Sequence, residues 1–415
     1  MEKVYDICCG IDVHKKLMVA CLKSGSKQEI RQTGATTREL LELADWLKAN
    51  DCQMVAMEST GSYWKPLYNI LEMSEIPAMV VNAQHMKAVP GRKTDVTDAE
   101  WIADLVKHGL LRASYIPSKD QRELREMVKY RKSLIEDRTR ELNRLQKMLE
   151  GANIKLSGTV KDINGMSARN ILNYLVSGAK FDEAKYDEMY KQKQIAHNLK
   201  ATKSQIIDDL NGVMSPLQRR VMKELLAHLD ELNEHIRNLN DEIDNFMKPE
   251  EQIAAAKIQD VPGIGNTSAQ AIISVIGTDM DRFPSDRHIS SWAGLCPGNN
   301  ETAQKRRSGK TRKGNALLRS TLTVCAQSAI KVKSCYYYAQ YMRICAHRGK
   351  KRAILAVAHS MLIAIYHILK YDIPYEELGA DYYNQFNREA KIKAYLKKLK
   401  ALGWEEPTAT VALPA

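Results

Sequence analysis

The chain has 415 residues, of which 44% are hydrophobic and 27% are charged, and its formal net charge is +12. This is the composition of an ordinary globular protein, and the length predicts two or three domains. The positive charge favours a polyanionic partner, although an ordinary basic cytosolic protein can carry the same charge.

We expect no membrane partner, because no run reaches the roughly 18 apolar residues that a membrane helix needs. The N-terminus, MEKVYDICCGIDVH, also lacks the basic and long apolar regions of a secretory signal. The eight cysteines form no C-x-x-C pair and no Cys/His cluster with zinc-ligand spacing. We therefore predict a reduced, cytoplasmic protein without structural zinc.

The first 115 residues alternate apolar runs with turn signals and helical periodicity. We predict strands at 4–13, 17–22, around Ile30, 53–57 and 78–81, and helices at 37–50, within 60–73 and from Thr97 to Leu111. The last helix would begin with the capping-box sequence Thr97-Asp98-Ala99-Glu100. The order β-β-β-α-β-α-β-α indicates an α/β domain with a mixed sheet, which is the plan of the ribonuclease-H-like nucleases.

Four acidic residues of this region, Asp12, Glu58, Asp95 and Asp98, lie where an apolar run meets a turn or a helix start. A carboxylate in such a place is costly unless it is compensated, and hard divalent cations bind carboxylate oxygens. Asp95 and Asp98 share a helix face, unless the helix begins only at Thr97 and Asp95 lies in the preceding turn. The set predicts a site for two Mg²⁺ (or Mn²⁺) ions that acts on phosphodiesters. We interpret His14 as a surface histidine rather than a metal ligand.

The character of the sequence changes to helical from residue 116 to about 250. Capping boxes at 118–121 and 215–218 begin two helices, with an inserted helical piece near 180–205 between them. The second helix carries a heptad pattern that predicts a coiled coil. Dimerisation and packing within one helical hairpin are equally compatible with it. The heptad residues are Val221, Leu225, Leu229, Leu232, Ile236, Leu239, Ile243 and Phe246.

A third region, from about 251 to 375, contains two elements suited to nucleic acid. The first, VPGIG at 261–265 before a small-residue helix, resembles a helix-hairpin-helix element. Gly263 and Gly265 would let backbone amides approach a phosphate, although a plain packing corner explains them equally well. The second is the glycine-rich, basic loop at 294–319, which favours nucleic acid over a merely solvated loop. Its expected phosphate contacts are Lys305, Arg306, Arg307, Ser308, Lys310, Arg312, Lys313 and Arg319. Helices are predicted at 316–347 and 350–371.

Five motifs follow one another along the chain: GIDVHK at 10–15, ESTGSYW at 58–64, KTDVTDA at 93–99, VPGIG at 261–265 and GLCPGNNET…SGKTRKGN at 294–315. In this combination the chain resembles the DEDD-type transposases of insertion sequences. These are recombinases whose ribonuclease-H-like, RuvC-like domain is related to Holliday-junction resolvases. The resemblance covers about residues 4–360.

The resemblance implies that Asp12, Glu58, Asp95 and Asp98 are the metal-binding acids of a catalytic domain at 1–115. It further implies a helical coiled-coil segment at 116–250, a mainly α-helical C-terminal transposase domain at 251–375 and a tail at 376–415. The implied partners are double-stranded DNA (element ends and target), a structured guide RNA and further copies of the chain in a dimer or tetramer. Such a protein acts in the cytoplasm, at the nucleoid.

The family's C-terminal domain supplies a serine that attacks DNA and forms a covalent phosphoserine link. The matching position here, directly after Asn299-Asn300-Glu301, is Thr302, whose hydroxyl can also act as a nucleophile when it is activated. Ser308 is the other candidate in the loop. If neither reacts, the protein would be a junction-resolving nuclease that uses metal-activated water. A non-catalytic nucleic-acid-binding protein is a further alternative, which the four intact acids disfavour.

Overall fold

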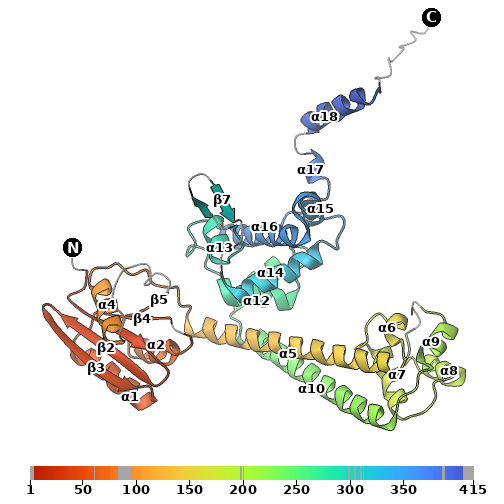
Figure 1. Ribbon diagram of the computed structural model, residues 1–415, viewed down its shortest axis with the longest axis horizontal. Coiled ribbons are helices and arrows are strands. Elements are labelled where there is room, and N and C mark those ends of the chain that lie inside the picture. The colour runs from red at the N-terminus through yellow and green to blue at the C-terminus, as the bar shows by residue number, and fades with distance from the viewer. Residues whose placement is uncertain are drawn as a thin grey trace, which may run out of the picture. The chain divides into compact units, whose positions relative to one another are not determined.

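The chain folds into two units, Met1–Ser118 and Lys119–Ala415 (Figure 1). The computed structural model describes residues 4–59, 61–82, 95–196, 199, 201–297, 300–302, 305–308, 311, 313–385 and 388–404. Only the backbone is described at 95–97, 300–302, 305–308, 384, 390 and 391. The predicted contacts Lys310 and Arg312 lie outside the described residues.

Unit one contains a five-stranded mixed sheet of order β3-β2-β1-β4-β5, which confirms the predicted α/β fold. β1 runs antiparallel to β2 and parallel to β4, while β3 and β5 form the edges. The elements are β1 (Ile7–Val13), β2 (Leu17–Ser24), β3 (Lys27–Gly34), α1 (Thr37–Ala49), β4 (Met54–Glu58), α2 (Trp64–Met73), β5 (Ala78–Val81) and α4 (Asp95–Lys107).

The ends of α4 differ from the prediction. The helix already includes Asp95, two residues before Thr97, and it ends at Lys107 instead of Leu111. Gly109 has φ +63°, its N–H donates to the carbonyl of Val106, and the N–H of Leu110 donates to the carbonyl of Leu105. This is the Schellman arrangement, which ends a helix at a left-handed glycine.

The two faces of the sheet are covered differently. Cys9, Ile11 and Val13 of β1 pack with α1 and α2 in the larger core of the unit. Alternate residues point to the opposite face, where Cys8 packs against α4. Asp12 and Glu58 belong to this second alternation, so the helix that covers their face is α4.

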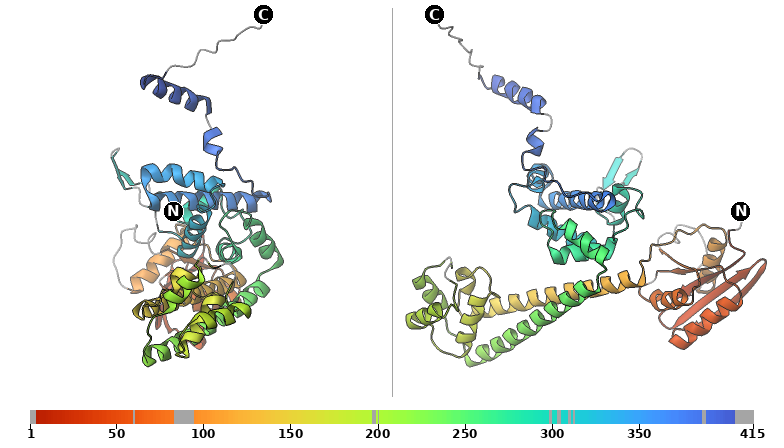
Figure 2. Two further views of the ribbon diagram at one scale, coloured as in Figure 1. Left: turned by 90° about the vertical axis from the view of Figure 1, so that its right-hand side faces the viewer. Right: turned by 180° about the vertical axis from the view of Figure 1, so that it is seen from behind.

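Unit two begins with two long helices, α5 (Lys119–Gly151) and α10 (Pro216–Phe246), which pack against each other (Figure 2). They are antiparallel, because Arg131 bonds to Asn240 whereas Arg138, further along α5, bonds to the earlier Asn233. The predicted apolar seam is therefore used inside the chain, as in a helical hairpin.

The first part of the heptad prediction was wrong by one residue. Val221 is 40% exposed, and Met222 and Leu226 are the buried positions of the first turns. These two side chains belong to a separate core formed with the helices inserted between α5 and α10. The buried face of an α-helix drifts relative to a 3.5-residue repeat. In the first turns of α10, packing against the inserted helices decides which residues are buried. The inserted helices are α6 (Leu156–Thr159), α7 (Met166–Val176), α8 (Glu183–Lys191) and α9 (Lys203–Leu210).

The rest of unit two is helical, with one two-stranded hairpin. The predicted helix at 316–347 is two helices, because turns at 330–335 interrupt it. The elements are α11 (Pro249–Ile258), α12 (Asn266–Ile276), α13 (Asp286–Trp292), β6 (Asn300–Thr302), β7 (Lys305–Ser308), α14 (Ala316–Ala329), α15 (Tyr336–Arg348), α16 (Lys350–Tyr371), α17 (Tyr382–Gln385) and α18 (Arg388–Ala401).

The prediction that no segment has the length and apolarity of a membrane span was wrong for helix α16. It meets both criteria, and it is the one such helix in the described part of the chain. It packs against α13, α14 and α15, and Val357, Met361 and Ile365 are fully buried in the core of unit two. Its apolar character is that of a central core helix.

Candidate nuclease and nucleic-acid sites

Asp12 and Glu58 lie at the same end of two neighbouring strands. The parallel register pairs Ile11 of β1 with Met57 of β4, so the next residue of each strand is an acid. Asp12 is opposite Val19, and Glu58 is opposite Val81, and both valines belong to the small cores under α4. Residues opposite each other share a face, so both carboxylates lie on the α4 face.

Helix α4 brings the other two acidic positions to this end of the sheet. It runs antiparallel to β1, because its C-terminal Lys107 accepts from Val4 while Ala99 lies over Gly10. From Gly10 to Asp12 the strand advances about 6.7 Å. From Ala99 back to Asp95 the helix advances about 6 Å in the same direction. The Asp95 position is therefore level with Asp12, and Asp98 follows on the same turn.

Gly10 permits this close packing. A Cβ atom there would lie closer than 3.0 Å to backbone atoms of Ala99, Ile102 and Ala103. The helix can therefore approach β1 only because residue 10 has no side chain. Gly10 was not among the predicted site residues. The signal that could have found it is a glycine inside an otherwise apolar strand, which commonly marks close approach of another backbone.

Asp12 is buried, with 7% of its surface exposed, and one of its oxygens is 2.9 Å from Nε2 of His14. His14 follows Asp12 by two residues, and its own side chain is 45% exposed. The interpretation of His14 as a surface histidine therefore omitted its contact with the acid. This hydrogen bond orients the Asp12 carboxylate.

The donor set of this face consists of carboxylate oxygens, the ligands of hard divalent cations. Among the side chains that the structure describes, no group of three or more His, Cys, Asp or Glu is arranged to hold a metal ion. The side chain of Asp95 is not among them. The register of β1 and β4 places Asp12 beside Glu58, and the buried Asp12 is the kind of carboxylate that a cation would compensate.

In unit two, the two glycines of the VPGIG turn have different surroundings. Gly263 has φ +87°, and a Cβ there would overlap the backbone of Cys325 and Ala329 in α14, so packing requires this glycine. Gly265 precedes the exposed first turn of α12, and nothing lies within 4 Å of an added Cβ. Packing therefore accounts for Gly263, whereas the space around Gly265 at the start of α12 is open.

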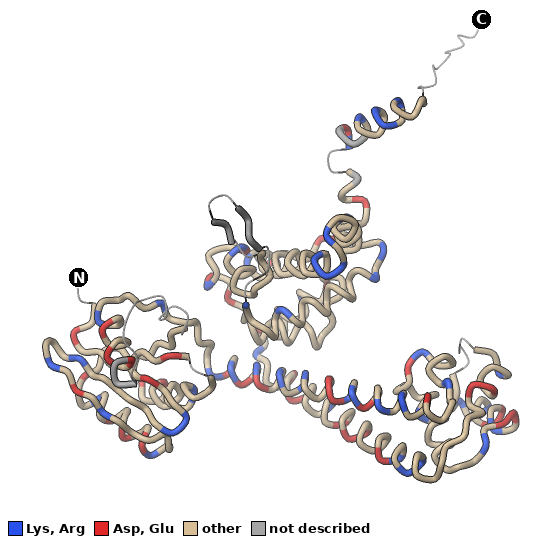
Figure 3. Tube along the Cα trace, in the orientation of Figure 1, with Lys and Arg blue, Asp and Glu red and all other residues tan. Residues whose placement is uncertain are grey.

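The basic loop is partly a β-hairpin. Thr302 pairs with Lys305 next to the turn, and Asn300 pairs with Ser308 at the base. The backbone of Arg306 and Arg307 lies in the same strand. Beyond it, Lys313 is exposed, and Arg319 donates to the hydroxyl of Thr311. Lys and Arg also recur along α5, at the start of α16 and in α18 (Figure 3).

Two family models match the chain, the first across unit one and the start of unit two and the second within unit two. A DEDD transposase model, described as "Transposase", matches residues 9–154, and a model described as "Transposase IS116/IS110/IS902 family" matches residues 255–342. Together they cover more than half of the sequence. The chain belongs to this family of insertion-sequence transposases. It is thus an enzyme of DNA recombination.

Curated relatives of the transposase are similar to it, two of them over most of their length. The "Transposase for insertion sequence element IS1111A" of Coxiella burnetii is 23% identical, covering 76% of this chain and 77% of its own. A "Probable family 20 transposase" of Pseudomonas aeruginosa is 22% identical, with coverages of 78% and 80%. The "Pilin gene-inverting protein" of Moraxella lacunata is 27% identical over 31% of this chain and 41% of its own.

Proposed function

We propose that the transposase cuts and rejoins DNA strands at the acidic face of unit one. The observation that carries this proposal is the register of β1 and β4, with Asp12 and Glu58 adjacent on the face under α4. We infer that Asp12, Glu58, Asp95 and Asp98 together hold Mg²⁺ or Mn²⁺. A cation bound there would offset the negative charge that develops on phosphate oxygens during strand cleavage. His14 would keep the Asp12 carboxylate in one orientation.

The sheet supports a ribonuclease-H-like, RuvC-like assignment for unit one. Three antiparallel strands are followed by two parallel ones, and the order is β3-β2-β1-β4-β5. In that plan the central strand carries the first acid, and a helix beside the sheet carries the last ones. Asp12 lies on the central strand β1, and Asp95 and Asp98 lie on α4.

A hydroxyl of the β6–β7 hairpin would be the nucleophile. Its oxygen would bond to phosphorus and displace one strand end, and the covalent link would conserve the phosphodiester energy for rejoining. Thr302, directly after the Asn-Asn-acid step, is the first candidate. Ser308 has a less hindered primary hydroxyl and lies at the base of the hairpin.

The surrounding elements would grip nucleic acid. Gly265 and the start of α12 would contact phosphates in a helix-hairpin-helix arrangement. The Lys and Arg side chains of the basic loop at 294–319 would contact further phosphates. The proposal also includes guidance by a structured RNA. It further includes assembly into a dimer or tetramer, with the α5–α10 hairpin as a coiled coil. The unit boundary at Ser118 supports a catalytic domain near 1–115. Helical, transposase and tail segments at 116–250, 251–375 and 376–415 are the further part of this proposal.

The acidic site is tested with Asp12→Asn in a plasmid strand-exchange assay. The isosteric amide keeps an acceptor for His14 but removes the charge that a cation needs. Exchange should be lost while DNA binding, followed by fluorescence anisotropy, is retained. The matched control is Asp45→Asn, which changes an exposed acid on α1. Normal exchange by Asp12→Asn would refute the catalytic role of this face.

The nucleophile is tested by trapping the protein on suicide DNA, in which the cleaved strand end is lost and rejoining is blocked. An adduct that disappears in Thr302→Val and persists in Ser308→Ala assigns the attack to Thr302, and the opposite pattern assigns it to Ser308. If the wild type cuts DNA without any adduct, the enzyme is a resolving nuclease that uses water. DNA binding without cleavage, in the presence of Mg²⁺ or Mn²⁺, would leave only the non-catalytic alternative.

A further inference from the structure

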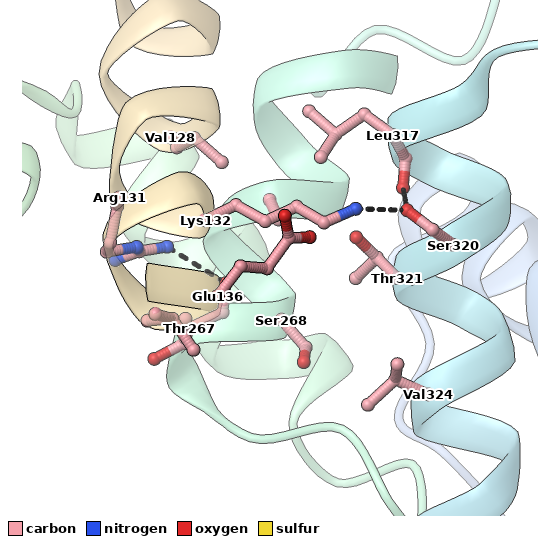
Figure 4. A pocket seen from close by; sticks show the side chains of 12 residues that line it. Val128, Arg131, Lys132, Glu136, Thr267, Ser268, Leu317, Ser320, Thr321 and Val324 are labelled. Carbon is pink, nitrogen blue, oxygen red and sulfur yellow. Dashed lines mark hydrogen bonds between the residues drawn. The ribbon is translucent and has the colours of Figure 1, made fainter. Parts of the chain in front are cut away.

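Three helices of unit two enclose a cavity of about 240 Å³ that no motif of the sequence indicated (Figure 4). Its walls come from the middle of α5, the first turns of α12 and the first half of α14. They are mainly aliphatic, with Val128, Ile135, Ala271, Leu317 and Val324 among the lining residues. Val324 is 57% exposed, so it lies at the mouth.

Two charged side chains of α5 enter this cavity from one side. Lys132 extends toward α14, where its Nζ donates to Oγ of Ser320 at 2.6 Å, and that hydroxyl donates to the carbonyl of Leu317 (Figure 4). Glu136, one turn later on α5, points between the same helices (Figure 4). Arg131 also lines the cavity, but its guanidinium donates to Asn240, Gln270 and the carbonyl of Thr267. Beside it, the cavity combines apolar walls with the cationic donor Lys132 and the anionic acceptor Glu136, a combination typical of a site for a polar ligand.

The cavity borders the two elements that we propose to contact phosphates. Thr267 and Ser268, which line it, are the second and third residues of α12, directly after Gly265. Leu317 and Ser320 lie in the first turns of α14, which follows the basic loop and Lys313. A backbone held by Gly265 and by the loop would therefore pass the mouth of the cavity.

We propose that this cavity receives one unstacked base of the bound DNA. The inference rests on the proposed function, because it requires nucleic acid on unit two. Extruding a base costs a few kcal/mol, and apolar walls with a small number of polar groups are what such a base needs. The pocket would hold the strand in register while the hairpin hydroxyl reacts.

The charges select the kind of base. A carboxylate accepts only, and an ammonium donates only. Glu136 would accept from an exocyclic amino group, and Lys132 would donate to a neighbouring ring nitrogen or carbonyl oxygen. Adenine, cytosine and guanine present both groups side by side, whereas thymine has no exocyclic amine. The occupant is therefore an amino-bearing base.

The test uses full-length protein and DNA from the ends of its insertion element, with 2-aminopurine placed at one position at a time. Its fluorescence rises when the base leaves the stack, so one position should brighten on binding. Val324→Phe narrows the mouth and should abolish that signal, while Val221→Phe, an exposed helical valine of α10, should not. At the same position, Glu136→Gln should reduce the preference for an amino-bearing base over thymine roughly fivefold to 100-fold. Anisotropy measures DNA affinity in each case.

The outcomes separate the two proposals. If the DNA binds but no position brightens, or Val324→Phe leaves the signal unchanged, the pocket assignment is overturned and the proposed function stands. If the wild type does not bind DNA of the element ends either alone or with the guide RNA, both are overturned. A signal obtained only when the scan is repeated on guide RNA would overturn the assignment to DNA.

Discussion

Replacing Gly10 by alanine should inactivate the enzyme without touching any acidic residue. A methyl group at this position meets backbone atoms of Ala99, Ile102 and Ala103 at less than 3.0 Å. Carbon atoms pack at about 3.5–4.0 Å. Since neither backbone can rotate away as a side chain can, α4 must move from β1 by roughly 1 Å.

Two magnitudes follow from that displacement. Overpacking of this kind costs about 1–3 kcal/mol of the free energy of unfolding. Moving Asp95 and Asp98 by about 1 Å relative to Asp12 and Glu58 should lower strand exchange on the order of 100-fold. Activity should therefore fall far more than the folded fraction, because a folded protein with a displaced helix still populates its native state.

The assay pairs plasmid strand exchange with urea unfolding. Gly151→Ala is the control, since nothing lies within 4 Å of an added Cβ at this position near the end of α5. It should leave both readouts near wild type. Wild-type exchange by Gly10→Ala would refute the idea that contact between α4 and β1 sets the geometry of the acids. Loss of exchange only in proportion to unfolding would show that Gly10 serves stability alone.

Three further predictions concern unit two. Arg131 is 1% exposed and donates to Asn240, Gln270 and the carbonyl of Thr267, so Arg131→Met should lower the free energy of unfolding by roughly 3 kcal/mol. In urea titrations, the exposed Arg140→Met should change that free energy by less than about 0.5 kcal/mol. Burial lowers the pKa of His359 below 6.5, although Asp286 opposes this. The unfolded chain then binds more protons below pH 6.5, so the stability of the protein falls as the pH drops from there. In thermal melts, His359→Gln should lack this pH-dependent loss of stability, and His347→Gln should retain it. Gly263→Ala should lower the melting temperature, because Cβ overlaps α14. Gly265→Ala should leave the melting temperature unchanged and weaken DNA binding in anisotropy titrations.

Local patterns were enough to predict most elements of unit one. Asp12 and Glu58 each follow an apolar run; β4 ends at Glu58, and β1 ends at Val13, one residue after Asp12. What the patterns lack is long-range geometry. The register of Ile11 with Met57 joins residues 46 apart in the chain, and no periodicity encodes it. The contact of Gly10 with α4 is equally remote, which is why the tightest constraint on the site was missed.

In unit two, periodicity predicted helices better than it predicted their partners. The heptad of α10 correctly identified Leu229 to Ile243 as buried, and from Leu232 onward these residues share a core with α5. It failed at Val221, where packing against the inserted helices selects Met222 instead. The same limit applies to α16, whose apolar composition suits a lipid or a protein interior, and only its packing against α13, α14 and α15 distinguishes them.

The charge of the chain is divided unequally between the units. From this division we expect unit two to bind DNA and unit one to carry out strand cleavage. Residues 1–118 carry 14 Lys and Arg against 15 Asp and Glu, a net charge of −1, so residues 119–415 carry +13. Nucleic acid is therefore attracted by unit two, whereas the acidic face repels phosphates unless cations occupy it. Each phosphate contact contributes about 0.9 to the slope of log affinity against log salt. Lys313→Gln should thus lower that slope by about 0.9, while Lys48→Gln on α1 and Asp12→Asn should leave it unchanged, as measured by anisotropy from low to high salt. If Lys48→Gln lowers the slope as much as Lys313→Gln, unit one also contacts DNA phosphates, and the assignment of DNA binding to unit two alone is wrong.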